Sequence, residues 1–458
     1  TAQMDALHAD LVAYHQLYDI YNDYDGVVNV KTINDHAGSD PVPVDDRILG
    51  MLELVQKMYD ATDGKLNIAM GSVLRIWHDY REAAESHENE ADNTLPSQEE
   101  LDAAAAANVA ELIDAIYVQS RTEETDAQCA AAKEAWDALT DEQKELVEGE
   151  EASPDYFGLD TGDASKDDPR NQDEIGEKEL LVVSFGTSFN DSRVADIKSI
   201  EDALQEANPD WSVRRAFTAQ IIINHIQARD GEKIDNMEQA LERAVANGVK
   251  QLVVQPTHLM HGAEYDEMNE MLDEYRDKFE SVAVAEPLLG EVGADAAVIN
   301  ADKEAVAKAI TAAAVKDAGF ESLDAAKDAG TAFVFMGHGT AHVAKVTYSQ
   351  MQTQMQQLGY ENVFIGTVEG EPEETACEAV IEAVKAAGYT NVVLRPLMVV
   401  AGDHANNDMA GSEEDSWKTM FEAAGFTVDC QIHGLGEIAD VQALYVAHTK
   451  AAIDSLNA

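Results

Sequence analysis

The sequence predicts an α/β fold in which two similar halves, each a doubly wound parallel sheet, face each other across a cleft. Short apolar segments alternate with amphipathic helical stretches from residue 179 onward. Both halves open with an apolar strand that leads into a Gly-Thr turn, and a proline-containing segment recurs later in each. In front of the halves, the pattern predicts an α+β fragment and then an α-helical module. The expected divisions are 1–96 (fragment), 97–150 (helical module), 151–178 (acidic linker), 179–330 (first half) and 331–458 (second half).

The composition excludes several classes of function. The chain has 458 residues and a net charge of −57, from 31 basic and 88 acidic residues. This charge argues against a general binder of nucleic acid or of anionic lipid. No apolar run approaches the ~18–20 residues of a membrane span, and no secretory signal is visible. The 3 cysteines form no CxxC pair, so neither a thiolate zinc site nor a disulfide framework is expected.

The region before residue 179 shows three successive patterns. The fragment mixes aromatic, Asn and Gly residues and has the composition of a small globular piece. The helical module is rich in Ala and Glu, and Ser97 with Glu100 and Thr140 with Gln143 fit the capping box of a helix start. The acidic linker is punctuated by Gly and Pro and has almost no apolar periodicity, which predicts a mobile segment.

The two halves are predicted from the alternation of strands and helices. Eight strands are expected, over 179–185, 211–217, 250–256, 281–287, 331–337, 362–368, 391–400 and 426–432. Helical stretches between them predict right-handed crossovers, which bring the carboxyl ends of all parallel strands to one edge of a sheet. Ligand sites in such folds lie at that edge.

An internal repeat supports the division into halves. The aligned segments are 180–188 with 332–340 and 255–268 with 395–408. Under this alignment Pro256 matches Pro396, and Glu264 matches His404. The Ala- and Lys-rich stretch over 291–330 is then a helical connection between the two repeats.

Three polar residues follow successive strands of the second half, and they form the candidate metal site. His338 follows its first strand, Glu369 its second and His404 its third. Two imidazoles and a carboxylate suit Co²⁺, Ni²⁺, Fe²⁺ or Zn²⁺, and the same groups accept protons near neutral pH. The alternative, which the residues leave open, is that each is an ordinary polar residue of a turn.

Further candidates come from the first half and from the turn after His338. Glu264 is expected to face the cleft from the first half, where it could accept protons. His258 and His261 flank it, and for both a place in the core or at the rim is favoured over metal ligation. His342 is a weaker candidate for the metal site.

The first strand of the first half leads into a turn, SFGTS, that predicts an anion-binding site. Backbone N–H groups and hydroxyls at the start of a helix favour negative ligands. The residues assigned to this site are Ser184, Gly186, Thr187 and Ser188. Arg215, in the second strand, is expected to add a cationic contact for carboxylates. A tight turn without a ligand is the alternative, and neither GxGxxG nor a P-loop is present.

From about residue 179 to 458, the chain resembles the anaerobic sirohydrochlorin cobaltochelatases, which are class II tetrapyrrole chelatases. The motifs that carry the resemblance are LLVVSFGTS, RAFT (215–218), the Gly-Ala-Glu-Tyr stretch at 262–265, FMGHG (335–339), the Glu369 loop, RPLMVVAGDHANNDM (395–409), DSWK (415–418) and GLGE (434–437).

The resemblance implies a two-halved fold that inserts Co²⁺ into sirohydrochlorin during anaerobic cobalamin synthesis. It implies that His338 and His404 bind the metal and accept pyrrole protons, that Glu369 is a further ligand, and that Glu264 is a cleft glutamate. Cobalt is then a substrate and no organic cofactor is required, while Ni²⁺ and Fe²⁺ stay open as alternative metals. Assembly into a homo-oligomer is an open expectation.

The first segment resembles the front part of FAD:protein FMN transferases, through NVKTINDHAG (29–38) and TDGKLNIAMGSVLRIWHDYR (62–81). The later glycine-rich motif of that family, with its metal-binding aspartate, is missing here, which argues against flavin transfer. A remnant and a residual flavin-binding or docking role are the alternatives. The helical module resembles small repeats of bacterial surface proteins, so compartment is left open between the cytoplasm and the outside.

Two functions therefore stand against each other. The first is an enzyme, a cobaltochelatase over 179–458. The second is a carrier of metal or tetrapyrrole on the same fold. Multiple turnovers would distinguish the enzyme from a carrier that binds one equivalent.

Overall fold

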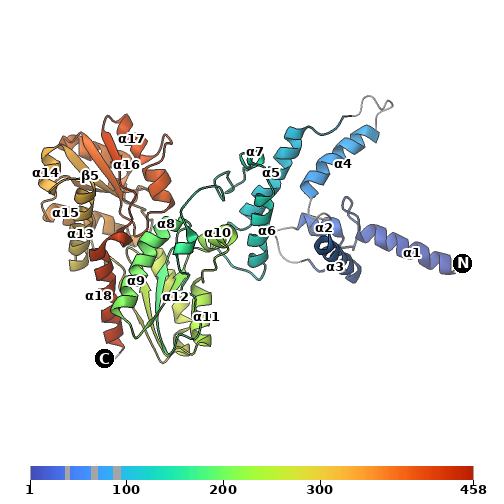
Figure 1. Cartoon of the computed structure of the whole chain (residues 1–458), viewed down its shortest axis with the longest axis horizontal. Coiled ribbons are helices and arrows are strands. Elements are labelled where there is room, and N and C mark those ends of the chain that lie inside the picture. Colours follow the sequence, from blue (N-terminus) through green and yellow to red (C-terminus); the bar gives the residue numbers. More distant parts are fainter. Residues whose placement is uncertain (1, 37–41, 63–70, 86–93, 457–458) are drawn as a thin grey trace. The chain divides into compact units, whose positions relative to one another are not determined.

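The computed structural model describes residues 2–36, 42–62, 71–85 and 94–456 (Figure 1). These residues divide into two compact units. The N-terminal unit comprises Thr1–Ala115 and Glu134–Tyr156, and the α/β unit comprises Ile116–Lys133 and Phe157–Ala458. Residues 157–178 of the expected linker and residues 116–133 of the expected helical module therefore belong to the same unit as the two halves.

The N-terminal unit is helical in its described residues. Its helices are α1 (Ala2–Leu17), α2 (Val30–Asp35), α3 (Asp46–Ala61), α4 (Gly71–Glu85), α5 (Gln98–Asp114), α7 (Asp141–Lys144) and the end of α6 (Thr125–Asp137). Both expected capping boxes are confirmed, at Ser97 before α5 and at Thr140 before α7. The described residues of 1–96 hold no strand beyond one isolated bridge between Tyr24 and Val27, so the α+β character of this fragment stays a prediction.

Part of the resemblance to the flavin transferases lies outside the described residues. Residues 37–38 of the first motif and residues 63–70 of the second belong to this part. The rest of those motifs forms α2 and α4.

The first half of the α/β unit follows the expected alternation. Its elements are β1 (Lys178–Ser184), α8 (Asn190–Ser192), the π-helix η3 (Arg193–Lys198), α9 (Ser199–Ala207), β2 (Ser212–Phe217), α10 (Gln220–Asp230), α11 (Met237–Ala246), β3 (Gln251–Pro256), α12 (Ala263–Asp273), η4 (Arg276–Lys278) and β4 (Ser281–Val284).

The second half repeats the pattern after a helical connection of α13 (Ala301–Asp317) and α14 (Leu323–Asp328). Its elements are β5 (Thr331–Gly337), η5 (Val343–Lys345), α15 (Val346–Gln357), β6 (Val363–Thr367), η6 (Glu373–Thr375), α16 (Cys377–Ala387), β7 (Asn391–Pro396), the π-helix η7 (Ala405–Met409), α17 (Trp417–Ala423), β8 (Thr427–Cys430), η8 (Leu435–Glu437) and α18 (Ala439–Ser455).

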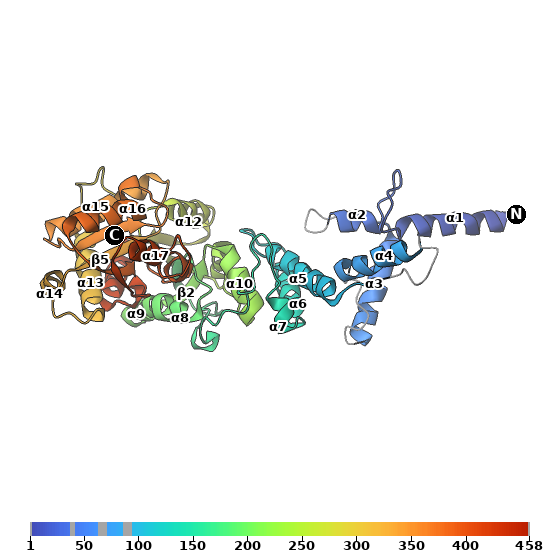
Figure 2. The ribbon, with the colours of Figure 1, turned by 90° about the horizontal axis from the view of Figure 1, so that it is seen from above.

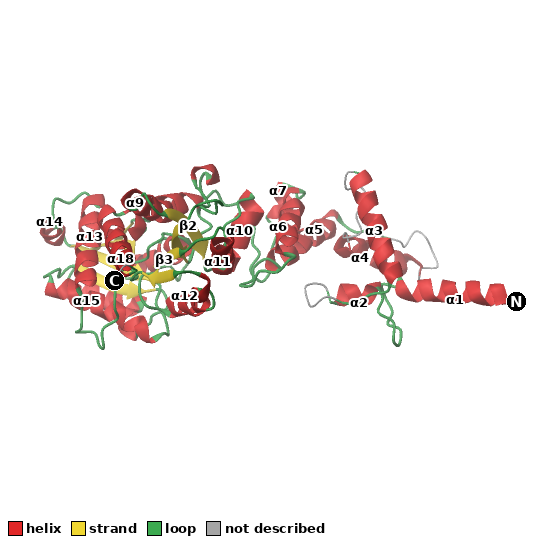
Figure 3. Cartoon of the chain, turned by 90° about the horizontal axis from the view of Figure 1, so that it is seen from below, coloured by secondary structure: helices red, strands yellow, loops and turns green. Residues whose placement is uncertain are grey.

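The two sheets have the same topology. The strand orders are β2-β1-β3-β4 and β6-β5-β7-β8, and all pairs are parallel. All eight expected strands are present, with ends that differ by a few residues. Central strands such as β5 are buried along their whole length, as near-continuous apolar runs require when helices cover both faces of a sheet. Figure 3 shows the strands in yellow among the red helices, and Figure 2 shows β5 among α13, α15, α16 and α17.

The last helix of each half crosses to the other half. Helix α13, which follows the first sheet, packs on α15, whereas α18, at the end of the second half, packs on α9 and β3. The Tyr445 hydroxyl of α18 donates to the Thr257 carbonyl at 2.8 Å, and Thr449 donates to Gln255 at 2.7 Å. One apolar cluster accordingly contains β1, β5 and α18 residues. The two halves therefore share a core.

The sheet register corrects the expected repeat by one residue in the first strand. Val183 lies opposite Pro256 in the first sheet, and Met336 lies opposite Pro396 in the second. With the two prolines equivalent, Phe185 of the first half corresponds to His338, and Gly186 corresponds to Gly339. Both glycines have positive φ, +107° and +96°, which supports this register because such backbone favours glycine.

The segment before β1 is not the mobile linker that its composition predicts. The side chain of Asp167 is 0% exposed and pairs with Arg193 at 2.7 Å and with Arg215 at 2.6 Å. Arg170 pairs with Glu201 at 3.2 Å and also with Asp202. Apolar periodicity did not reveal this packing, because the segment is fastened through buried ion pairs.

In the part of the chain that the structure describes, no helix has the length and apolar character needed to cross a membrane.

We predict that Asp167→Ala lowers the free energy of unfolding by about 3–5 kcal/mol, because it leaves two buried guanidinium groups without their shared carboxylate. Urea unfolding followed by circular dichroism measures this change. Asp210→Ala, at an exposed position of the same half, is the control and should change stability by no more than about 0.5 kcal/mol. Equal effects of the two substitutions would contradict a structural role for the segment before β1.

Candidate active site

His338 lies directly after β5, between two glycines that the packing requires. A Cβ at Gly337 would lie 2.3 Å from the Tyr348 ring, and a Cβ at Gly339 would lie 2.7 Å from the Glu369 Cβ. The Tyr348 hydroxyl also accepts a hydrogen bond from the Gly339 N–H at 3.1 Å. The Gly-His-Gly sequence therefore lets the chain turn tightly while an exposed imidazole leaves the end of the strand.

The tautomer of His338 follows from its one intramolecular hydrogen bond. Its Nδ1 lies 2.8 Å from the Gly339 carbonyl oxygen. A carbonyl oxygen can only accept, so Nδ1 carries the proton and donates it. The lone pair of the neutral ring is then on Nε2, where it is free to bind a metal ion or a proton.

His404 lies between β7 and η7 and has the same tautomer. Its Nδ1 lies 2.6 Å from Asp408 Oδ2, so the carboxylate accepts the Nδ1 proton and Nε2 keeps the lone pair. The ring centroids of His404 and His338 are 4.6 Å apart, with an angle of 74° between the ring planes. The structure thus brings the two predicted histidines together at the carboxyl edge of the second sheet.

Glu369 lies beside His338 but does not close a three-ligand group with the histidines. Its backbone N–H donates to the His338 carbonyl at 2.9 Å, and its side chain is exposed. Among the described residues, the one set of three ligand atoms within 4.8 Å of one another belongs to Asp403, His404 and Asp408. The metal role of Glu369 therefore stays a prediction.

Glu264, near the start of α12, is exposed, and its charge reaches groups in both halves. Burial raises the pKa of Tyr348, in the second half, to about 12, and the charge of Glu264 adds to this shift. Burial lowers the pKa of His258 to about 4, against the opposing influence of Glu264. Both ring nitrogens of His258 are buried and contact no polar partner, as expected for a neutral histidine of the core.

The two remaining histidine candidates contact carboxylates. His261 lies 2.7 Å from Glu286. His342 of the second half lies 3.4 Å from Asp266 of the first, so it links the halves.

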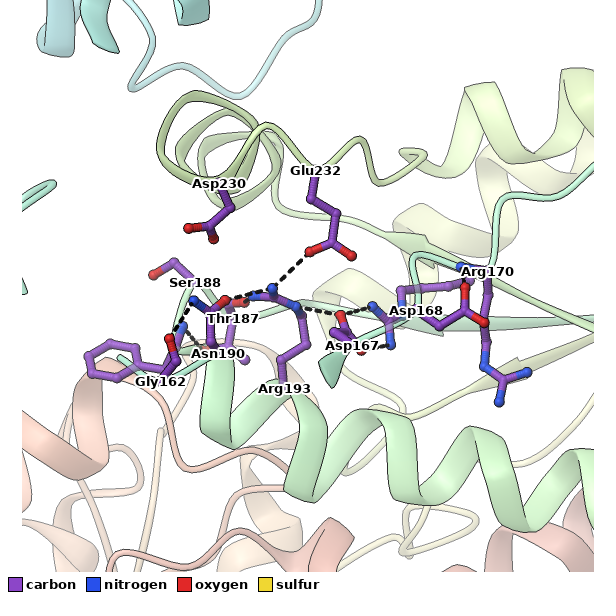
Figure 4. Close-up of polar contacts among 12 residues, drawn as sticks. Gly162, Asp167, Asp168, Arg170, Thr187, Ser188, Asn190, Arg193, Asp230 and Glu232 are labelled. Carbon is purple, nitrogen blue, oxygen red and sulfur yellow. Dashed lines mark hydrogen bonds and ion pairs between the residues drawn. The ribbon is translucent and has the colours of Figure 1, made fainter. Parts of the chain in front are cut away.

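The SFGTS turn is held from inside the protein, as Figure 4 shows. Buried Arg193 donates to the Thr187 carbonyl at 3.2 Å and to Asn190 at 2.7 Å, and it pairs with Glu232 at 3.0 Å. The Thr187 hydroxyl accepts from the Phe189 N–H at 3.1 Å. These contacts fix the backbone of the turn.

The hydroxyls expected to bind an anion are mostly turned inward. Ser184 is 1% exposed and Thr187 is 4% exposed, and the Ser184 hydroxyl is hydrogen-bonded to Thr257 at 2.7 Å. A Cβ at Gly186 would lie 2.6 Å from the Phe217 ring, which explains the glycine by packing. Ligand binding by Gly186 and Ser188 stays a prediction.

The expectation that Arg215 meets a ligand is wrong. Its side chain is 0% exposed and contacts Glu201 at 2.8 Å and Asp167 at 2.6 Å. Burial alone would raise the pKa of Asp167, but Arg215 and Arg193 hold it below its ordinary value. Arg215 is therefore paired with carboxylates of the core and is not available to a ligand.

Sequence reasoning missed Tyr348, Asp403 and Asp408. Asp408 follows His404 by four residues, a spacing at which helical side chains meet, so this pair could have been found. Tyr348 carried no signal, because its role depends on the packing of α15 against the end of β5.

Two family models match parts of this chain. The model of the cobalt chelatase (CbiK) family matches residues 178–454, and the model of the ApbE family matches residues 2–136. A sirohydrochlorin cobaltochelatase of Salmonella typhimurium is 34% identical over 278 residues, which cover 61% of this chain and 97% of that protein. The sirohydrochlorin cobaltochelatase CbiKC of Nitratidesulfovibrio vulgaris is 28% identical over 291 residues, or 63% and 95% of the two chains.

Among solved structures, SirB from Bacillus subtilis with Fe³⁺ aligns with a TM-score of 0.42 and 14% identity, over 61% of this chain and 97% of that one. The SirB of Bacillus subtilis subspecies spizizenii in complex with cobalt aligns with a TM-score of 0.39 and 12% identity, over 62% and 97%.

We predict that Asp408→Ala weakens divalent metal binding at His404 by roughly 10- to 100-fold, because the imidazole loses the acceptor that fixes its tautomer. Titration of the purified protein with Co²⁺, followed by calorimetry, measures this affinity. Asp429→Ala, at an exposed position in β8, is the control. Unchanged affinity in Asp408→Ala would show that Asp408 does not prepare His404 for a metal.

Proposed function

The chain belongs to the cobalt chelatase family, and we propose that its α/β unit inserts Co²⁺ into sirohydrochlorin at the edge that carries His338 and His404. The chain is a metal chelatase, and a tetrapyrrole and a divalent metal ion are its substrates. The observation that carries the proposal is the paired imidazoles, whose ring centroids are 4.6 Å apart and whose Nδ1 atoms both already donate a hydrogen bond.

The first task of the site is to hold the metal ion. Each imidazole can offer the lone pair of Nε2, and we assign the exposed carboxylate of Glu369, which follows the neighbouring strand β6, as a further ligand. Such a borderline N/O set binds Co²⁺ without binding it irreversibly, and it does not by itself exclude Ni²⁺ or Fe²⁺. The preference for cobalt is therefore inferred from the activity of the relatives and not from the types of ligand.

The second task is to remove protons. Insertion of one divalent ion replaces two pyrrole N–H protons, so two protons must leave the macrocycle for each ion that enters. When the ion passes to the pyrrole nitrogens, the Nε2 lone pairs of His338 and His404 become free and can take these protons. Asp408 then faces an imidazolium at His404, and this ion pair favours the proton transfer.

Glu264 is placed to assist from the first half. Its carboxylate is exposed, and its charge acts on Tyr348, which underlies the His338 turn. A carboxylate here can accept a proton or relay one to solvent. We assign it this role and leave metal binding to the second half.

We predict that His338→Ala and His404→Ala each lower chelatase turnover by roughly 100- to 10,000-fold, because each removes a metal ligand and a proton acceptor together. The measurement is the absorbance change of sirohydrochlorin with excess Co²⁺ under anaerobic conditions, above the uncatalysed rate. His78→Ala, in the N-terminal unit, is the control. Turnover like that of the wild type in either variant would overturn the site assignment, and a change that stops at one equivalent would indicate a carrier.

The macrocycle needs an apolar contact as well as a metal. Between residues 178 and 454, all of which the structure describes, Phe185 is the one aromatic residue among the exposed large apolar residues, at 46% exposure. It corresponds in register to His338. Phe185 belongs to the same turn as Thr187. A Cβ at Gly402, in the loop that leads to His404, would lie 3.2 Å from the Thr187 hydroxyl oxygen. We assign Phe185 to stacking on the tetrapyrrole ring.

We predict that Phe185→Ala raises the KM for sirohydrochlorin by roughly 3- to 10-fold, because ring stacking contributes about 0.5–1.5 kcal/mol. Affinity for Co²⁺ should not change, and Phe185→Trp should restore the KM. Steady-state kinetics at saturating Co²⁺ tests this. An unchanged KM in Phe185→Ala would place the macrocycle elsewhere.

A further inference from the structure

One residue of the loop that leads to His404 is held by the other half of the protein. The Ala401 N–H donates to Asp196 Oδ2 at 2.9 Å, and the Ser192 hydroxyl donates to the Ala401 carbonyl at 2.6 Å. Both Asp196 and Ser192 come from the first half, at the π-helix η3 and the turn before it. Both the N–H and the carbonyl group of Ala401 are therefore hydrogen-bonded to the first half.

The backbone hydrogen bonds of residues 397–399 are made within the second half, although Val400 packs on apolar residues of the first half. The Leu397 N–H donates to the Met336 carbonyl at 2.7 Å, and the carbonyls of Met398 and Val399 accept from η8 at 2.9 Å. Asp196 and Ser192 therefore supply the last anchor before His404, three residues further on. Through these two hydrogen bonds the first half can set the position of the His404 imidazole.

The surroundings of Asp196 leave no room for adjustment. Asp196 is 0% exposed. A Cβ at Gly434 would lie 2.3 Å from its carboxylate oxygens, and a Cβ at Gly436 would lie 2.5 Å from its backbone carbonyl oxygen. The second oxygen, Oδ1, is buried and has no hydrogen-bond partner. A π-helix at this place is in keeping with a functional position, because such bulges re-aim a side chain at a cost in helix stability.

We propose that Asp196 is a positioning residue that holds Ala401 and thereby keeps His404 beside His338 for metal insertion. The proposal rests on the proposed chelatase function, and it adds a first-half residue to a site whose metal ligands lie in the second half. Ionisation of Asp196 would place a poorly solvated charge beside the negative charge of Glu437, and this repulsion would loosen the packing of η8 and of the loop that it holds.

The charge state follows from the groups that face Asp196. Burial raises the pKa of Asp196 to about 8, the hydrogen bond from Ala401 opposes this shift, and the charge of Glu437 in η8 adds to it. The backbone N–H of Glu437 and the more distant Arg395 in β7 act in the lowering direction. Asp196 is therefore mostly protonated at neutral pH and ionises in the mildly alkaline range.

The sign of the effect on stability is fixed by linkage. An unfolded chain loses this proton near pH ~4, whereas the folded protein keeps it up to about pH 8. The unfolded state therefore binds fewer protons across this interval, and the stability of the wild type falls as pH rises through it. A neutral residue of the same shape removes that loss.

The test compares Asp196→Asn with the wild type in the full chain. The amide oxygen can still accept from Ala401, so we expect Asp196→Asn to keep the wild-type kcat/KM near pH 7 and to lack the fall in activity that the wild type shows above about pH 8. The melting temperature of Asp196→Asn should vary less than that of the wild type between about pH 6 and about pH 9. Asp196→Ala, which removes the acceptor, should lower kcat/KM roughly tenfold near pH 7 and, without a carboxyl to ionise, should also lack the alkaline fall.

The controls separate this inference from the proposed function. Asp210→Asn, at an exposed position, should leave both pH profiles unchanged. If Asp196→Asn does not fold, Ser192→Ala tests the same anchor and should weaken Co²⁺ binding a few-fold without altering the pH profile. If kcat/KM fell equally above about pH 8 in the wild type and in Asp196→Asn, the proposed role of Asp196 would be wrong. A wild type without turnover at any pH would overturn the chelatase, while the melting profiles would still report on Asp196.

Discussion

The parallel pairing of β5 with β7 is the constraint on which the candidate site depends. Met336 lies opposite Pro396, and the Leu397 N–H extends the ladder by donating to the Met336 carbonyl at 2.7 Å. The chain therefore leaves both strands at the same edge, and the two histidines that follow meet with ring centroids 4.6 Å apart. Because β6 pairs with the other side of β5, Glu369 reaches the same edge from the opposite direction.

The two halves share this frame but not its chemistry. Both sheets have the same strand order, and both central strands end in a turn with a positive-φ glycine followed by threonine. At the position of His338, however, the first half carries Phe185. The imidazoles thus belong to the second half, while the first half contributes an exposed aromatic ring, the carboxylate of Glu264 and the anchor at Asp196. We propose that this division lets the second half hold the metal while the first half meets the macrocycle.

Much of this arrangement could be predicted from sequence, because strand alternation and strand ends are local signals. The eight strands and the placement of His338 and His404 at one edge came from periodicity and spacing alone. The prediction that Arg215 contacts a ligand was wrong, because alternation indicates the face of the sheet to which a side chain points but not the residues that cover this face. Its partner Asp167 lies in a segment without apolar periodicity, and no local pattern announces a buried ion pair. The repeat was one residue out of register because apolar strands resemble each other at neighbouring offsets.

Because its most deeply buried arginines are paired internally, this acidic chain needs other groups to recognise a substrate that carries carboxylates. Arg193, Arg214 and Arg215 are all fully buried, and each guanidinium pairs with carboxylates of the core. These cations hold the first half together, and none of them is left to attract the substrate. Long-range attraction then works against a chain of net charge −57, an effect that salt screens beyond about 10 Å. We propose that recognition rests on short-range contacts with the metal ion and with the exposed aromatic ring of Phe185, both at the edge where the strands end.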